Sequence, residues 1–306
     1  MIGRPSRAAD HGRRYSRVMP STSRKSAPKS AKTRHSLGVL IAVLLASGCA
    51  GDTPTEADLA SDEVAPDIET QARFHGQEQE SARPIVLVAG LLQDKNTVAP
   101  LAKALRARGL DVTVWVPPNL GLDDIDGNVG LLGRTIEGVR RRTRAAKVDL
   151  LGHSQGGVTA RRYVQLAGGD APVETLVSMG SPQQGTEVGA LADLLIAAGL
   201  LNWAEGATQL AAGSEFLFEM NEQLDPTPGD VRYVAIGTQQ DEVTKPVARS
   251  GIPGGENVVM QEACPDRSVG HFGLLEDAWV EQVVFSVLAG GPAEGDCAAL
   301  PLGGAS

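Results

Sequence analysis

The sequence predicts an α/β domain with a mostly parallel sheet and helices on both of its faces. Short apolar runs alternate with helical patterns along the chain, which is typical of a parallel sheet covered by helices. Residues 84–291 are enough for one domain with a sizeable core. A glycine-rich turn at residues 152–156 joins an apolar strand directly to a helix, which is one unit of the strand–helix alternation.

The apolar runs predict six strands, and the helical patterns predict four helices. We expect the strands at 85–88, 112–116, 148–151, 176–179, 231–236 and 258–261. We expect the helices at 97–108, 131–145, 157–167 and 274–288.

A long insertion, about residues 185–229, interrupts this alternation. Its first stretch, residues 191–201, is apolar nearly all round, which is unusual for a helix on the surface of a domain. We expect a helical cap or lid above the sheet. The alternative is an extra packed helical layer that contacts no substrate.

The first 48 residues predict an export signal. They carry ten of the 28 basic residues and one of the 37 acidic residues, and the apolar run 37–46 is too short to span a bilayer. The following Ala46-Ser47-Gly48-Cys49 is similar to a bacterial lipoprotein cleavage box, so Cys49 is a candidate for lipidation and membrane anchoring. The alternatives are secretion without lipidation and a membrane-anchoring helix. We therefore expect an exported protein, either a cell-envelope lipoprotein or a secreted one.

Three further segments follow the signal. Residues 49–83 are acidic and have little apolar periodicity, which predicts a flexible tether. Residues 84–291 form the expected folded domain, and residues 292–306 form a C-terminal tail. Beyond residue 48 the chain has 18 basic and 36 acidic residues, so it would repel phosphate backbones. We expect a monomer without a nucleic-acid partner and interpret the arginines within 134–144 as a solvated helix face.

Cysteine usage is consistent with export. If Cys49 is an anchor, only Cys264 and Cys297 remain, and an exported compartment permits them to form a disulfide. The bond would pin the tail beside the loop that carries His271, and the loop-entropy picture assigns it on the order of 3 kcal/mol. With no Cys-x-x-Cys pair and five histidines, the sequence does not support a zinc site, and we expect no metal and no cofactor.

The glycine-rich turn matches the G-x-S-x-G nucleophile elbow, which places a serine on a strained turn between a strand and a helix. The motif reads Gly152-His153-Ser154-Gln155-Gly156. The predicted strand 148–151 precedes it and the predicted helix 157–167 follows it, which is the context the motif needs. Ser154 is therefore the candidate nucleophile. The alternative is a plain strand-turn-helix connection.

A serine nucleophile needs a histidine base, and elimination selects His271. His11 and His35 lie in the leader, and His75 lies in the tether. We expect His153, in the elbow itself, to point away from the serine. His271 also follows the serine and the acid in chain order, as this motif requires.

The third member should be a carboxylate that holds the histidine in one tautomer. Asp241 follows the predicted strand 231–236, in a loop at the end of the strand where catalytic groups gather. Glu242 is its main competitor, and Asp225 and Asp266 are weaker ones.

The oxyanion that forms during acyl transfer needs backbone N–H donors already in place. One should come from Gln155, the residue after the nucleophile, and one from the loop after an early strand. That loop contains Gly90 and Leu91, so Leu91 and Gln155 are the candidate donors.

The motif segments resemble a family. The segments 148–157 and 179–186 are similar to the elbow and the following strand and loop of Pseudomonas-type and Burkholderia-type lipases. The segments 241–246, 264–265 and 271–274 look closer to actinobacterial lipases and Candida antarctica lipase B. The resemblance covers residues 84 to about 288 and implies the α/β-hydrolase fold of secreted bacterial lipases.

This resemblance implies carboxylic-ester hydrolysis by Ser154, Asp241 and His271 on a lipid or other acyl ester. The chain has Ala89-Gly90 where many of these lipases have His-Gly, and Leu91 stands where lipase B has a threonine. The calcium-binding aspartates of the Pseudomonas type have no clear match. The alternatives are acyl transfer, or hydrolysis of a polyester or phospholipid, by the same residues. A binding protein that has lost its chemistry is a further alternative.

Overall fold

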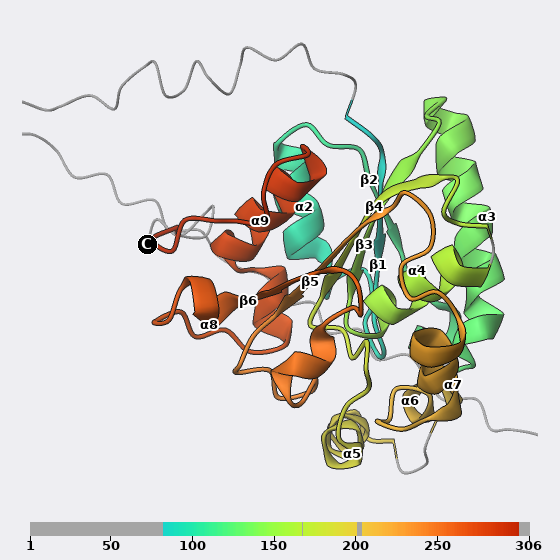
Figure 1. Ribbon diagram of the computed structural model, residues 1–306, viewed down its shortest axis with the longest axis vertical. Helices are drawn as coiled ribbons and strands as arrows, with labels where there is room; N and C mark the ends of the chain where they lie inside the picture. The colour runs from blue at the N-terminus through green and yellow to red at the C-terminus, as the bar shows by residue number, and fades with distance from the viewer. Residues whose placement is uncertain (1–81, 167, 201–203, 300–306) are drawn as a thin grey trace, which may run out of the picture. The chain divides into compact units, whose positions relative to one another are not determined.

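A parallel sheet forms the centre of the computed structural model, which describes residues 82–166, 168–200 and 204–299 (Figure 1). The strand order is β2-β1-β3-β4-β5-β6, and every neighbouring pair is parallel. The strands are β1 (Ile85–Val88), β2 (Val112–Trp115), β3 (Val148–His153), β4 (Val173–Met179), β5 (Arg232–Gly237) and β6 (Glu256–Val259). The predicted fold class is confirmed.

Helices cover both faces of this sheet (Figure 1). On one face, α2 (Ala99–Ala107) and α9 (Ala278–Leu288) pack on strand side chains such as Leu87 and Leu151. On the other face, α3 (Ile125–Thr143) and α4 (Gln155–Leu166) pack on Val86 and Leu150. Because side chains alternate along a strand, each strand supplies both cores.

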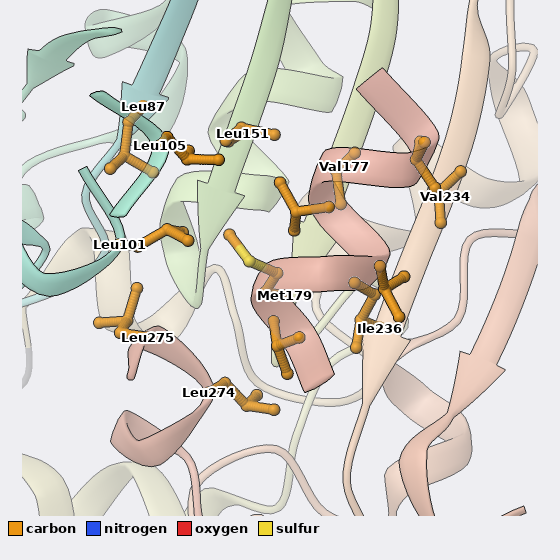
Figure 2. Packing of buried hydrophobic residues seen from close by; sticks show 14 of the residues in the cluster. Leu87, Leu101, Leu105, Leu151, Val177, Met179, Val234, Ile236, Leu274 and Leu275 are labelled. Atoms are coloured by element: carbon orange, nitrogen blue, oxygen red, sulfur yellow. The ribbon is translucent and has the colours of Figure 1, made fainter. Parts of the chain in front are cut away.

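Figure 2 shows the first of these cores from close by. Leu101 and Leu105 of α2 contact the sheet beside Leu87, and Leu274 and Leu275 close the cluster at the end of the strands. These side chains are almost completely buried. The core is continuous from β1 to β5 and provides a rigid base for the loops at the carboxyl ends of the strands.

Several element boundaries differ from the predicted ones, and capping side chains explain two of these differences. α3 begins at Ile125 instead of 131, because the Asp124 side chain accepts hydrogen bonds from the amides of Asp126 and Gly127. The predicted helix 274–288 is divided into a 3-10 turn, η4 (Phe272–Leu275), and α9, which Asp277 caps. β6 ends at Val259, and Met260 begins the short helix α8 (Met260–Ala263) instead of extending the strand to 261.

The insertion at 185–229 is helical in its described parts. It contains α5 (Val188–Ala197), α6 (Glu205–Thr208), α7 (Glu215–Phe218) and the π-helical turn η2 (Glu219–Gln223). Leu195 of α5 and Ala207 of α6 form one buried cluster with Leu91, which follows β1. The insertion therefore packs beside the loop that the sequence selects for an oxyanion donor.

Two further 3-10 turns, η1 (Pro118–Gly121) and η3 (Val247–Ser250), complete the described elements. No helix among the described residues combines the length and apolar character needed to cross a membrane. The predicted signal, Cys49, the tether up to residue 81 and the end of the tail from residue 300 lie outside the described residues.

Candidate active site

The candidate residues gather at one edge of the sheet. Gly90 follows β1, Ser154 follows β3, Asp241 follows β5, and His271 follows β6 and α8. Because all the strands are parallel, their carboxyl ends meet at this edge, where open α/β sheets bind ligands.

Ser154 occupies the tip of a sharp turn between β3 and α4. Its φ of 56° lies in the left-handed region, which is strained for a residue with a side chain. Its amide donates to the carbonyl of Met179 at 2.9 Å, and its carbonyl accepts from the amide of Gly157 at 3.1 Å. The turn is thus held from both sides.

Glycine is required at both flanking positions of the elbow. A Cβ at Gly152 would collide with the backbone of Gly157, and a Cβ at Gly156 would collide with the carbonyl of Val88. Neither glycine has a positive φ, so close approach of the chain explains the two glycines of the motif.

Asp241 and His271 are in direct contact. Nδ1 of His271 lies 2.9 Å from Oδ2 and 3.0 Å from Oδ1 of Asp241, and both side chains are buried. Oδ1 also accepts from the amides of Val243 at 2.8 Å and Thr244 at 2.6 Å. These bonds hold the carboxylate against Nδ1, which favours a proton on that nitrogen of the imidazole.

The carboxylate of Glu242, the competing acid, contacts the backbone of His271 and not its imidazole. Its Oε2 accepts the backbone amide of His271 at 2.9 Å. The two neighbouring carboxylates thus hold the same histidine at different atoms, and Asp241 is the one that reaches the imidazole. Neither Asp225 nor Asp266 has a hydrogen bond to His271 among the described residues.

The hydroxyl of Ser154 makes no hydrogen bond to another described residue. Hydrogen bonds of a nucleophile often tighten only when substrate binds. His271 lies beside the elbow, because its ring centroid is 4.7 Å from that of His153.

The loop after β1 lies against the elbow, as an oxyanion hole requires. A Cβ at Gly90 would lie 2.8 Å from Cβ of Ser154 and 3.2 Å from the amide nitrogen of Gln155. Neither the amide of Leu91 nor that of Gln155 donates a hydrogen bond to a described residue. Both amides thus remain available to an oxyanion at Ser154.

The side chain of Gln155 has a separate task. Its Nε2 donates to the carbonyl of Gly121 at 2.9 Å and to that of Gly206, in α6, at 3.2 Å. Gln155 therefore holds the insertion next to the elbow. The motif pattern contains no signal for this contact.

The sequence assigns no role to His153 or Gln93, because elimination sets His153 aside and no motif includes Gln93. Nδ1 of His153 lies 2.7 Å from Nε2 of Gln93, and its Nε2 lies 2.9 Å from the carbonyl oxygen of His271. Burial, with a smaller contribution from the charge of His271, lowers the pKa of His153 to about 3. His153 is therefore neutral at physiological pH.

A disulfide joins Cys264 to Cys297, with the two Cα atoms 5.4 Å apart. Arg267, between Cys264 and His271 in the chain, pairs with Asp277 at 2.8 Å and donates to the carbonyl of Cys297 at 2.9 Å. The tail up to residue 299 is thus attached beside the histidine loop. Across the described part of the chain, no three His, Cys, Asp or Glu side chains are grouped as a metal site would require.

Comparisons with known proteins agree with this architecture. The family model of palmitoyl protein thioesterases matches residues 84–226. A triacylglycerol lipase of Pseudomonas fragi is 29% identical over 139 residues, which are 44% of this chain and 46% of that lipase. The chain therefore matches about half the length of this curated relative.

The similar solved structures include two lipases. Aspergillus fumigatus lipase B has a TM-score of 0.59 at 18% identity, with 72% of this chain and 55% of that chain covered. The mature form of Bacillus licheniformis lipase BlEst2 has a TM-score of 0.54 at 18% identity, with 68% and 93% covered. With its parallel sheet and its nucleophile elbow, the chain has the α/β-hydrolase fold that these lipases share.

Proposed function

We propose that this protein is a serine carboxylic-ester hydrolase, a lipase or lipase-like esterase. The observation that carries the proposal is a serine in a strained elbow beside a buried Asp241–His271 pair. A serine hydroxyl becomes an effective nucleophile only when such a pair accepts its proton.

The reaction has two halves. Ser154 attacks the ester carbonyl while Nε2 of His271 takes its proton, and the amides of Leu91 and Gln155 stabilise the oxyanion. His271 then protonates the departing alcohol, which leaves an acyl-enzyme at Ser154. Water, activated by the same histidine, releases the acid and restores the serine.

We propose that the insertion at 185–229 acts as the acyl-binding cap. Leu195 and Ala207 pack on Leu91 next to the proposed oxyanion hole, while Val188 and Ile196 on α5 are 55% and 64% exposed. An apolar helix with an exposed edge beside the site suits a lipid surface. We therefore expect modest interfacial activation, and a rate that stays flat across the solubility limit of the substrate would contradict it.

The first experiment is hydrolysis of p-nitrophenyl esters from acetyl to palmitoyl, with Ser154→Ala as the control. Strong Ser154-dependent activity on long chains would support a lipase, and activity on short chains alone would support an esterase. Absence of Ser154-dependent turnover on every chain would contradict the proposal. Adding an acceptor alcohol to the same assay distinguishes acyl transfer from hydrolysis, and phospholipid and polyester substrates test the remaining alternatives.

Long-chain acyl thioesters are a second candidate substrate class, favoured by the match of residues 84–226 to the palmitoyl protein thioesterase family model. The same triad and acyl-enzyme would serve both ester types. Comparing kcat/KM for palmitoyl-CoA with that for p-nitrophenyl palmitate decides between them, because a thioesterase would prefer the thioester.

We also propose that the protein is exported, anchored through a lipid on Cys49, and monomeric. The basic leader, the short apolar run and the cysteine that follows them support the export and the lipid anchor. Detergent partitioning of the full chain and of Cys49→Ser tests it, since loss of the lipid should move the variant to the aqueous phase. Equal partitioning of the two proteins would contradict the anchor.

A further inference from the structure

Three loops of the active site are joined by one chain of buried hydrogen bonds. The Gly90 amide donates to Oε1 of Gln93 at 2.8 Å. Nε2 of Gln93 lies 2.7 Å from Nδ1 of His153, and Nε2 of His153 lies 2.9 Å from the carbonyl oxygen of His271. Gln93 is 1% exposed and His153 is 0% exposed, so water does not compete for these bonds.

The groups at the two ends of this chain, the Gly90 amide and the His271 carbonyl, determine which atom donates in each hydrogen bond. The amide of Gly90 can only donate, so the oxygen of Gln93 must face it and the NH₂ group must face His153. Nδ1 of His153 therefore accepts. At the other end the carbonyl of His271 can only accept, so Nε2 of His153 must carry the proton. Both ends thus select the same neutral tautomer.

This chain of hydrogen bonds, which we call the bridge, holds the backbone carbonyl of His271, and Glu242 holds its backbone amide. Glu242 accepts the amide of His271 at 2.9 Å, while His153 donates to its carbonyl. Asp241 holds the imidazole through Nδ1. The side chain of His271 is thus oriented by Asp241, and its main chain is located by Glu242 and His153.

A neutral His153 suits this location. The two imidazole rings are 4.7 Å apart, with an angle of 49° between their planes. In the proposed reaction His271 becomes positively charged, and a second cation at this distance would oppose that step. Burial keeps the pKa of His153 far below its ordinary value, so the bridge carries no charge.

We propose that His153 is a positioning residue, which together with Gln93 sets the distance between the general base His271 and the oxyanion loop at Gly90 and Leu91. This inference rests on the proposed function. Displacement of a catalytic group by about 1 Å can cost on the order of 100-fold in rate. A bridge that fixes two catalytic loops relative to each other therefore acts mainly on kcat.

The test uses the full chain with four single variants and the double variant His153→Phe/Gln93→Leu. His153→Phe keeps a ring but loses both hydrogen bonds, and Gln93→Leu removes the link to Gly90. His153→Gln keeps one acceptor and one donor and serves as the conservative variant. Gln282→Leu in α9, which removes the hydrogen bond that Oε1 of Gln282 accepts from the amide of Asp296, is the matched control outside the bridge.

We expect His153→Phe and Gln93→Leu each to lower kcat by roughly 10-fold to 100-fold with little change in KM. The double variant should be no slower than the slower single variant, because both substitutions break one chain. His153→Gln should recover most of the loss, and Gln282→Leu should retain the kcat of the wild type. Unchanged kcat with a lower Tm, or fully additive losses, would overturn the inference.

Histidine ¹⁵N NMR of the wild type provides a readout that does not depend on activity. We expect His153 to be neutral with its proton on Nε2 at pH 7, and a proton on Nδ1 would overturn the bridge. If the wild type hydrolyses no ester yet shows the Nε2 tautomer, the proposed function fails while the bridge stands. If Ser154-dependent hydrolysis is unaffected in both bridge variants, the inference fails while the proposed function stands.

Discussion

The carboxylate of Asp241 contacts Nδ1 of His271 through both oxygens, at 2.9 and 3.0 Å. Its neighbour Glu242 instead accepts the backbone amide of the same histidine. The two adjacent carboxylates therefore hold different atoms of His271, and substituting each of them in turn tests the two contacts separately.

Asp241→Asn should lower kcat by about 10⁴-fold, the loss found when the acid of a serine-protease triad is neutralised and the histidine adopts the wrong tautomer. Glu242→Gln should cost far less, because an amide oxygen still accepts the amide of His271. Steady-state kinetics of both variants on one ester checks this. Equal losses would show that Asp241 has no special role.

Gly90→Ala should lower kcat by about 100-fold or more, the usual effect of losing one oxyanion donor. The added methyl would lie 2.7 Å from the carbonyl oxygen of His153 and 2.8 Å from Cβ of Ser154, so the loop must shift. Gly138→Ala in α3, where a Cβ meets no atom within 4 Å, is the matched control. A Gly90→Ala enzyme as fast as this control would exclude the loop from the oxyanion hole.

Gln155→Met should loosen the insertion while retaining the backbone amide at the nucleophile. Loss of the bonds to Gly121 and Gly206 leaves buried carbonyls unpaired, at a cost of about 1 to 3 kcal/mol in the free energy of unfolding. Hydrogen exchange in α6 should become faster, and KM for long acyl chains should rise. Unchanged exchange in α6 would contradict this link.

The contribution of Asp149 to the free energy of unfolding should fall as the pH rises from about 4 to 6. Burial in β3 raises the pKa of its carboxyl from 3.8 to about 6, and Arg83 at 3.1 Å offsets only part of this effect. The folded state then binds the proton more tightly than the unfolded state does. Its contribution is fully present below pH 3.8 and is lost as the pH passes about 6, a change of about 3 kcal/mol.

The free energy of unfolding of Asp149→Asn, measured by urea denaturation across this pH range, provides the comparison. The free energy of unfolding of the wild type, relative to that of the variant, should fall as the pH rises through this range. A constant difference would show that the carboxyl titrates normally in the folded protein.

Cys264→Ser/Cys297→Ser should lower the free energy of unfolding by about 3 to 4 kcal/mol, the loop-entropy value for a 33-residue separation. Guanidinium denaturation of the oxidised wild type and the double variant measures it. The reduced wild type should behave like the variant, and an equal stability of all three forms would contradict a structural disulfide.

Local sequence patterns alone determined the fold class, the elbow and the candidate histidine of this protein. The alternation of apolar runs and helices predicted the parallel sheet, because strand and helix periodicities are local properties of the chain. The glycines around Ser154 predicted the elbow, because few residues fit that backbone. His271 followed from elimination among five histidines.

The tertiary structure alone decided which groups meet. Asp241 and Glu242 are neighbours in the chain, and only the packing of their loop determines which one faces the imidazole. The Gln93–His153–His271 bridge joins residues 60 and 118 positions apart, and the division of helix 274–288 depends on the cap at Asp277. Such contacts arise because parallel strands bring distant loops to one edge of the sheet, which no short stretch of sequence encodes.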